Sequence, residues 1–351
     1  MKNIIKLKKK QNVALVPADR ITNTTVEARR QEILEKGRKF KYPVQYSKHK
    51  LVINAIVIST IAAAIGAIAL WYQLYKVQNT GTFIYRVSLF APVSVADIDG
   101  EKALYSDYLA QYRSNISVTE KQEGPLASEE DEKRRSDYYK RQSMDNIIAN
   151  TFAIKLAKEY SISVSDEEIE EVFNEHRKTS HSEISESAFN KIIEDNYGLS
   201  PREYGRMFSE LPLLRKKVTA HIDGNAKQLQ SEVVAKLKAN DNDFAKTADQ
   251  FGGRVEMSAP GFVKLTNIDG GRTQIAATLS KGQVSKPFIS RASDGYYIVK
   301  LLDKKDDEVS YAYIKIPFTE FNKHLESIKS EGKIKEYISV PEVSQFEDTA
   351  P

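Results

Sequence analysis

The stretch from Leu51 to Tyr75, LVINAIVISTIAAAIGAIALWYQLY, contains no charged residue and is bracketed by Lys50 and Lys76. No other part of the chain is comparably apolar. A helix of this length, rising about 1.5 Å per residue, can span the roughly 30 Å hydrocarbon core of a bilayer, whereas a helix in a soluble domain needs only one apolar face. The sequence therefore predicts one transmembrane helix over residues 51–75, in contact with membrane lipid.

The charges on the two sides of this segment predict its orientation. Residues 1–50 hold 14 basic and 4 acidic residues, a net charge of +10, whereas the rest of the chain has a net charge of −6. Because an excess of Lys and Arg marks the cytoplasmic side, we expect a cytoplasmic N-terminus and extracytoplasmic domains in residues 76–351. A cleaved signal peptide is the competing interpretation, but both the polar lead and the apolar region are too long for one. We therefore expect an uncleaved signal anchor in the cytoplasmic membrane.

Residues 1–50 are predicted to be a basic cytoplasmic tail. Within the tail, Val26, Ile33 and Leu34 fall on one face of a possible helix surrounded by basic residues. A helix lying on anionic lipid is one interpretation of this pattern. We favour a solvated tail that sets the topology, because the apolar face is short and Gly37 weakens the helix.

Composition excludes several classes of function for the outer region. The chain has no cysteine, which removes disulfides, thiolate zinc sites and cysteine nucleophiles together. Its five histidines show no metal-ligand spacing, and no glycine-rich phosphate loop is present. The outer region is net acidic, with basic residues interleaved among acidic ones. We therefore expect no metal, no cofactor and no nucleic acid as a partner.

From about residue 129 to residue 220 the sequence is strongly helical. Three helix starts carry capping residues, at Ser128, Ser165 and Ser200, and the last two are followed three residues later by glutamate. The apolar residues between these starts recur at helical spacing, which indicates core positions. Pro212 is expected to kink the last helix or to end its first half.

This region resembles a known family of folding factors. The segments VADIDGEKALYSDY, NIIANTFAIKLAKEYSISVSDEEIEEVF and AFNKIIEDNYGLSPREYGRMFSELPLLRKKV are similar to the N-terminal chaperone region of extracytoplasmic foldases of the SurA, PrsA and PpiD type. The resemblance covers residues 94–220, and a linker is expected over residues 76–93. The segment FIYRVSLFAPVSVADIDGEKA, residues 83–103, has a β-like pattern. It implies a helical cradle whose exposed apolar patches hold unfolded chains without an active site.

Residues 221–304 resemble a parvulin-like, PpiC-type peptidyl-prolyl isomerase domain. The opening AHIDGNAKQLQSEVVAKLKANDNDFAKTADQF is similar to the family's first strand and two following helices. The closing LSKGQVSKPFISRASDGYYIVKLLDKK matches the family's last motif, including Gly282, Pro287 and Gly295. The resemblance implies a small α/β domain with an antiparallel sheet of about four strands wrapped by helices.

The same resemblance implies the site residues and also shows that the active site is degenerate. His221 matches the first of two histidines that the family places in the sheet, and Tyr297 stands where the second would be. Arg254 and Arg272 occupy positions where the family has a carboxylate or cysteine and an apolar residue. Tyr297 could donate a hydrogen bond in place of histidine, or it could be a core residue. The remaining pocket for a proline ring is expected to be lined by Phe262, Ile275, Leu279 and Phe288.

Residues 305–340 are predicted to be a C-terminal extension with an alternating strand, YAYIKI, and a helix, followed by a tail over residues 341–351. The strand either joins the parvulin-like domain or packs on the helical one. The whole chain is thus expected to be a membrane-anchored α+β protein. Its expected function is binding unfolded or newly exported polypeptides near the secretion machinery, with weak or no isomerase activity. An active isomerase and a non-catalytic envelope scaffold are the alternatives.

Overall fold

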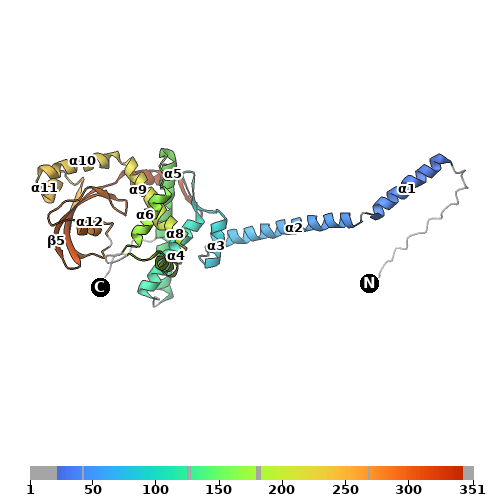
Figure 1. Ribbon diagram of the computed structural model, residues 1–351, viewed down its shortest axis with the longest axis horizontal. Coiled ribbons are helices and arrows are strands. Elements are labelled where there is room, and N and C mark those ends of the chain that lie inside the picture. The colour runs from blue at the N-terminus through green and yellow to red at the C-terminus, as the bar shows by residue number, and fades with distance from the viewer. Residues whose placement is uncertain are drawn as a thin grey trace. The chain divides into compact units, whose positions relative to one another are not determined.

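The computed structural model separates into two compact units, residues 1–71 and residues 72–351 (Figure 1). Residues 1–21 of the predicted tail and residues 343–351 at the other end lie outside the described part. The structure describes residues 22–41, 43–124, 126, 128–178, 183–267 and 269–342.

The first unit contains α1 (Asn23–Lys41) and most of α2 (Pro43–Tyr72). The apolar residues predicted for one face of the tail helix lie on α1, and all three are at least half exposed. In the described part of the chain, one helical stretch, Lys50–Val77, is long and apolar enough to cross a membrane. Its position agrees with the predicted span over residues 51–75.

The end of the apolar stretch lies inside the second unit, which corrects the expected linker over residues 76–93. Leu74 has no exposed surface. The Tyr105 hydroxyl donates to the Leu74 carbonyl at 2.6 Å, and the Tyr75 hydroxyl donates to the Ser94 carbonyl at 2.6 Å. The chain then forms a π-helical turn and a short helix, η1 (Gln73–Val77) and α3 (Thr82–Phe90).

The β-like approach predicted over residues 83–103 is confirmed by strands at Ser94–Ile98 and Glu101–Leu104, but it is wrong over α3. The residues of TFIYRVSLF favour strands locally, but strand preference yields to tertiary packing. Here Ile84 and Tyr85 are buried, and Arg113 donates to the Thr80 carbonyl and the Thr82 hydroxyl at 2.8 and 2.9 Å. Packing and these bonds stabilise the helix that the local sequence does not indicate.

The helical domain is confirmed, and its helices begin at the predicted caps. The Ser165 and Ser200 hydroxyls form complete capping boxes, and the Ser128 hydroxyl accepts from the Asp131 amide. Pro212 lies in the first turn of α9, directly after a π-helical turn that divides the predicted fourth helix. The helices are α4 (Tyr105–Glu123), α5 (Glu129–Tyr160), α6 (Asp166–His176), α7 (Glu186–Ile192), η2 (Ile193–Tyr197), α8 (Pro201–Gly205), η3 (Arg206–Glu210) and α9 (Leu211–Ile222).

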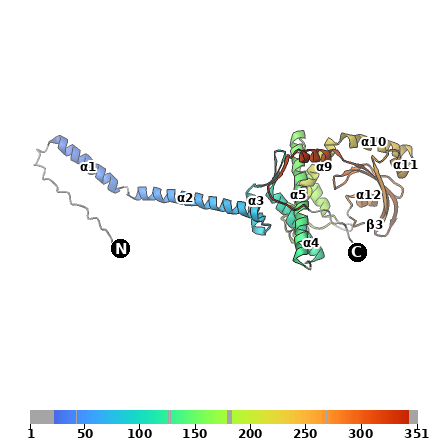
Figure 2. The same cartoon turned by 180° about the vertical axis from the view of Figure 1, so that it is seen from behind.

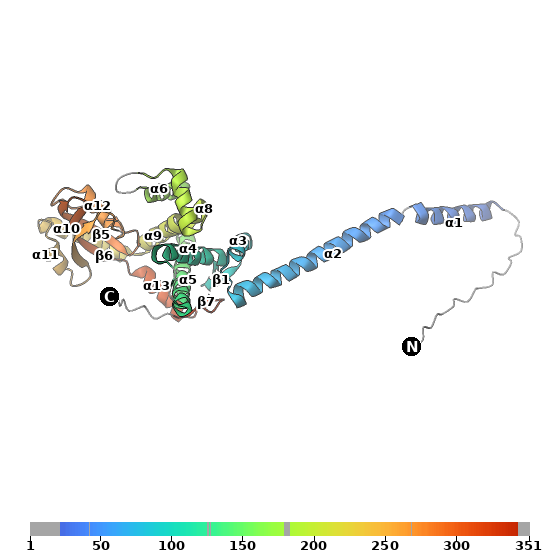
Figure 3. The ribbon, with the colours of Figure 1, turned by 90° about the horizontal axis from the view of Figure 1, so that it is seen from below.

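A three-stranded sheet with the order β2-β1-β7 connects the start of the helical domain to the C-terminal extension. β1 (Ser94–Ile98) pairs antiparallel with β2 (Glu101–Leu104) and with β7 (Ile334–Glu336). α13 (Glu320–Ser330) contacts α9, so the extension returns to the helical domain (Figure 3). The rings of Phe152 on α5 and Phe321 on α13 lie 5.3 Å apart.

A four-stranded antiparallel sheet with the order β3-β6-β5-β4 forms the second domain. Helices α10 and α11 cover one face through an apolar core that includes Val233, Phe244 and Ile314. Helix α12 covers the other face through a core that includes Ala276 and Val299 (Figure 2). The elements are α10 (Gly224–Ala239), α11 (Phe244–Asp249), β3 (Glu256–Lys264), α12 (Arg272–Thr278), β4 (Phe288–Ile289), β5 (Gly295–Lys305) and β6 (Glu308–Pro317).

The sheet differs from the predicted parvulin-like order at one strand. Residues 221–222, expected to open the domain as a strand, are the last turn of α9. The central place beside β5 is taken by β6, which comes from the predicted C-terminal extension. The alternating YAYIKI pattern therefore did predict a strand, and this strand joins the sheet while the helix after it packs on the helical domain.

Candidate functional site

Tyr297, expected at the second catalytic position, lies on the α12 face of the sheet. Its side chain is nearly buried, with 2% exposure, and its ring stacks on Phe288 of the neighbouring strand at 6.1 Å. The Tyr297 hydroxyl donates to an Asp294 carboxylate oxygen at 2.9 Å, and the Lys315 ammonium lies 3.2 Å from that carboxylate. The one hydroxyl proton of Tyr297 is therefore engaged and is not free to bond a substrate amide.

The charges around this hydroxyl keep it neutral. Burial would raise the pKa of Asp294, but hydrogen bonds from Ser290 and Tyr297 and the charge of Lys315 hold it below its usual range. Burial, together with the hydrogen bond to the Asp294 carboxylate, raises the pKa of Tyr297 above its usual value. Tyr297 is thus neutral, and its hydroxyl donates its hydrogen bond to the Asp294 carboxylate.

Arg272 occupies the space over the tyrosines on this face. Its guanidinium carbon lies 5.1 Å from the centre of the Tyr297 ring and 4.7 Å from that of Tyr313. Beside it, the Asp269 carboxylate accepts bonds from Tyr311 and Thr273. A proline ring needs an open apolar pocket, but here the guanidinium lies over the faces of both tyrosine rings. A proline ring therefore cannot pack on them.

The four residues expected to line the proline pocket have different environments. Leu279 is buried in the core under α12, and Phe288 packs against the same core. Ile275 is half-buried on α12, whereas Phe262 on β3 is 48% exposed. Leu279, Phe288 and Ile275 lie on the α12 side of the sheet, whereas Phe262 alternates with Val263 of that side and points to the opposite face, so the four residues do not form one pocket.

His221, the other expected catalytic residue, does not lie in the sheet. It is in the last turn of α9, with its ring 5.3 Å from the Tyr160 ring of α5. Tyr297 packs against Phe288 and Tyr313 instead. His221 is therefore part of the helical domain, and the structure does not form the expected pair.

A small apolar pocket in the helical domain was not predicted from the sequence. It has a volume of about 100 Å³ and lies between α6, η3 and α9, where Arg291 from the β4–β5 connection of the second domain completes its lining. Its apolar wall is formed by side chains that recur at helical spacing. Because this spacing is typical of core residues, the sequence alone does not indicate a pocket. The pocket is lined by Val172, Glu175, His176, Phe208, Ser209, Pro212, Leu213, Lys216 and Arg291.

The pocket combines an apolar wall with a polar rim. The Ser209 hydroxyl is buried and has no hydrogen-bond partner within the described part of the chain. On the rim, Arg291 lies 3.5 Å from the Glu175 carboxylate. Burial, followed by the charge of Arg291, lowers the pKa of His176, and burial lowers the pKa of Lys216. Such a site suits one apolar side chain of an extended peptide.

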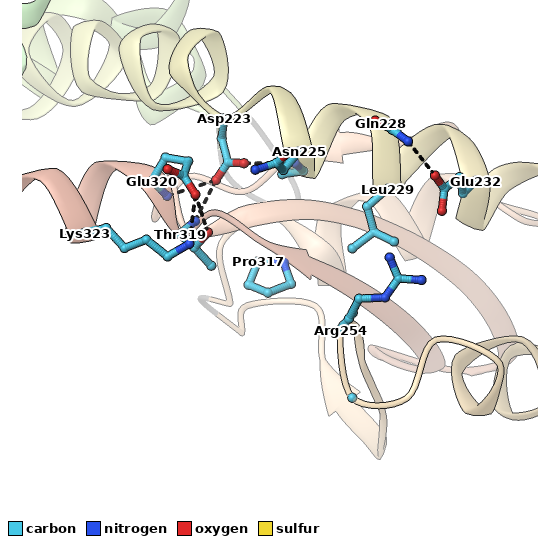
Figure 4. A pocket seen from close by; sticks show the side chains of 12 residues that line it. Asp223, Asn225, Gln228, Leu229, Glu232, Arg254, Pro317, Thr319, Glu320 and Lys323 are labelled. Atoms are coloured by element: carbon cyan, nitrogen blue, oxygen red, sulfur yellow. Dashed lines mark hydrogen bonds and ion pairs between the residues drawn. The ribbon is translucent and has the colours of Figure 1, made fainter.

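A larger and more polar groove, of about 530 Å³, lies in the second domain (Figure 4). At one end the buried Asp223 carboxylate accepts backbone N–H bonds from Ala226, Thr319 and Glu320. Arg254 lies across the groove, next to Leu229 of α10. Charges of both signs line this groove, so it favours polar segments over apolar side chains.

None of these groups is arranged to hold a metal. Within the described ranges, no three His, Cys, Asp or Glu side chains come together as a metal site.

Comparison with known proteins agrees with the helical architecture. Residues 44–218 match the family model of the SurA-like N-terminal domain. A chaperone SurA of Shewanella frigidimarina (strain NCIMB 400) is 28% identical over 169 residues, which is 45% of this chain and 38% of that protein. The aligned part spans less than half of that relative. The family match ends before the second domain.

Proposed function

We propose that this protein is a membrane-anchored extracytoplasmic folding factor that holds unfolded or emerging exported chains on its helical domain. The observation that carries the proposal is the match of residues 44–218 to the SurA-like N-terminal domain. A binding role needs exposed or accessible apolar sites and no catalytic group. The apolar pocket lined by Val172, Phe208 and Leu213 provides such a site.

The anchor is proposed from charge and apolar length. The stretch Lys50–Val77 is long enough to span, and the net charge of +10 before it favours a cytoplasmic N-terminus. Leu74 is buried in the second unit, so residues 51–72 are the part available to lipid. At about 1.5 Å per residue they extend over roughly 33 Å, enough for the hydrocarbon core.

Tethering allows each contact with a client to be weak. A domain fixed to the membrane meets exported chains at a high effective concentration near their exit, so an apolar pocket of modest size can still capture and release them. The secretion machinery is the partner that this position favours.

The second domain is proposed to bind rather than to catalyse. Rotation about an X-Pro bond needs an apolar cup and polar groups that favour the twisted amide. Arg272 over the tyrosine rings, Tyr297 committed to Asp294, and His221 outside the sheet all argue against a rapid isomerase.

The test is an aggregation assay run beside an isomerase assay on the full chain in detergent. We expect the wild-type protein to suppress aggregation of a chemically unfolded exported protein. Leu213→Asp in the apolar pocket should weaken this suppression, and Leu302→Asp, at an exposed apolar position on β5, is the matched control. Equal suppression by both variants would remove the pocket from the proposal.

The isomerase assay follows the cis-to-trans exchange of a proline tetrapeptide. We expect no more than a small acceleration over the uncatalysed rate. A large acceleration that is lost in Tyr297→Phe would replace the binding role by the active isomerase. Crosslinking that captures one dominant partner and no unfolded clients would favour the scaffold alternative.

A further inference from the structure

Helix α3 exposes two aromatic side chains to an unusual degree. Phe83 is 77% exposed and Phe90 is 89% exposed, and Leu89 on the same helix is 42% exposed. Burying a large apolar side chain is worth about 1.5–3 kcal/mol relative to exposure, so this arrangement is unfavourable in water. The exposed side chains therefore indicate a partner surface.

The two exposed phenylalanines share one side of α3. At 100° per residue, Phe83 and Phe90 point in nearly the same direction, and Leu89 lies about 100° from Phe90, at the edge of the buried side. The opposite side, with Ile84, Tyr85 and Ser88, is buried in the helical domain. The helix therefore carries apolar side chains on both sides, and the protein covers only one of them.

The place of α3 in the chain identifies what covers the other side. Four residues separate Val77, at the end of the apolar stretch, from Thr82. Even fully extended, this connection spans at most about 17 Å. It does not move freely, because the Asn79 amide nitrogen donates to the Gln73 side-chain oxygen at 2.9 Å. Arg113 fixes the start of α3 through the two bonds described above.

The end of the apolar stretch is equally fixed to the domain. Leu74 is buried, and Tyr75 and Tyr105 make the two hydroxyl bonds that join η1 to β1 and α4. Their rings meet edge to face at 5.8 Å. Within the second unit, α3 and the last turn of the apolar stretch are therefore both held by α4, through Arg113 and Tyr105.

We infer that α3 is an interfacial helix whose exposed side chains, Phe83, Leu89 and Phe90, insert into the membrane–water interface on the extracytoplasmic side and hold the domain against the lipid. The inference rests on the proposed anchor. Aromatic side chains favour the interfacial zone, and a helix with an apolar face can lie in it. Arg86, on the same side of α3, is half exposed and donates to the Glu203 carboxylate at 2.8 Å, so its cation lies beside the two phenylalanines.

The test is tryptophan quenching in vesicles of phosphatidylethanolamine and phosphatidylglycerol, with and without brominated acyl chains. Trp71 is the single tryptophan of the chain and lies in the proposed anchor. Phe83→Trp and Phe90→Trp are each made in a Trp71→Phe background. Phe262→Trp in the same background is the control, because Phe262 is exposed on β3 and is far along the chain from the anchor.

We expect brominated lipid to quench the new tryptophan in both α3 variants by a fraction comparable with that of wild-type Trp71, and to leave the Phe262→Trp variant unchanged. If wild-type Trp71 is quenched but both α3 variants behave like Phe262→Trp, the inference is wrong and the anchor stands. If wild-type Trp71 is not quenched, the anchor fails and the inference fails with it.

Discussion

The buried carboxylate of Asp223 caps two helices. We therefore expect an unusually large decrease in the free energy of unfolding when this carboxylate is removed. One oxygen accepts the Ala226 N–H at 2.9 Å at the start of α10. The other accepts the Thr319 and Glu320 N–H groups at 2.7 and 3.2 Å at the start of α13. Asp223 is 1% exposed, and its removal leaves three N–H groups without their acceptor.

The magnitude follows from the number of bonds. A lost helix cap costs about 1 kcal/mol, and a buried hydrogen bond to a charged group costs about 1.5–3 kcal/mol. Three bonds at two helix starts therefore predict a decrease of about 3 kcal/mol in the free energy of unfolding for Asp223→Ala. Asp243→Ala is the matched control, because the exposed Asp243 caps only α11 through one bond to Lys246 at 3.0 Å, and it should cost about 1 kcal/mol.

Urea unfolding of the full chain in detergent, followed by far-ultraviolet circular dichroism, measures the two decreases. Amide hydrogen exchange then shows which helices lose protection, and we expect the protection of α10 and α13 to decrease together in Asp223→Ala. The reasoning is refuted if the two variants lose the same free energy, or if α13 keeps its protection in Asp223→Ala.

Three further changes have definite expected results. Arg272→Ala removes a cation over two rings and should lower the free energy of unfolding by about 1–2 kcal/mol, without raising the isomerase rate in the tetrapeptide assay. Gly295→Ala places a Cβ against the Ile316 carbonyl and should cost about 1–3 kcal/mol in urea unfolding. The pKa of His176 is lowered in the folded state by burial, so below about pH 6.5 the unfolded chain binds a proton that the folded protein does not. Stability should therefore fall as the pH is lowered from about 6.5, and His176→Gln should reduce this slope in urea unfolding.

Helix starts could be predicted from the sequence because capping is local. Ser165 and Ser200 each meet a glutamate three residues later, and both form the predicted capping boxes. The apolar stretch at residues 51–75 is equally local, since its length and composition alone define it. These features need no knowledge of distant residues.

The parts that could not be predicted depend on contacts far apart in the sequence. The sequence of residues 308–317 predicts a strand. That this strand pairs with β5, in the place expected for a strand at His221, depends on which segment fills the sheet. The fold of α3 depends on Arg113 and on a buried Tyr85. The replacement of an apolar residue by Arg272 was visible, whereas its position over two rings needed the folded sheet.

The central claim is that the helical domain holds unfolded chains through its apolar pocket. A photoreactive amino acid placed at Leu213 tests this directly, with the same amino acid at Leu302 as the control and one purified exported protein offered both unfolded and folded. The account predicts a crosslink from position 213 to the unfolded protein, little to the folded one, and little from position 302. Equal crosslinking from both positions, or equal capture of the folded protein, would contradict it.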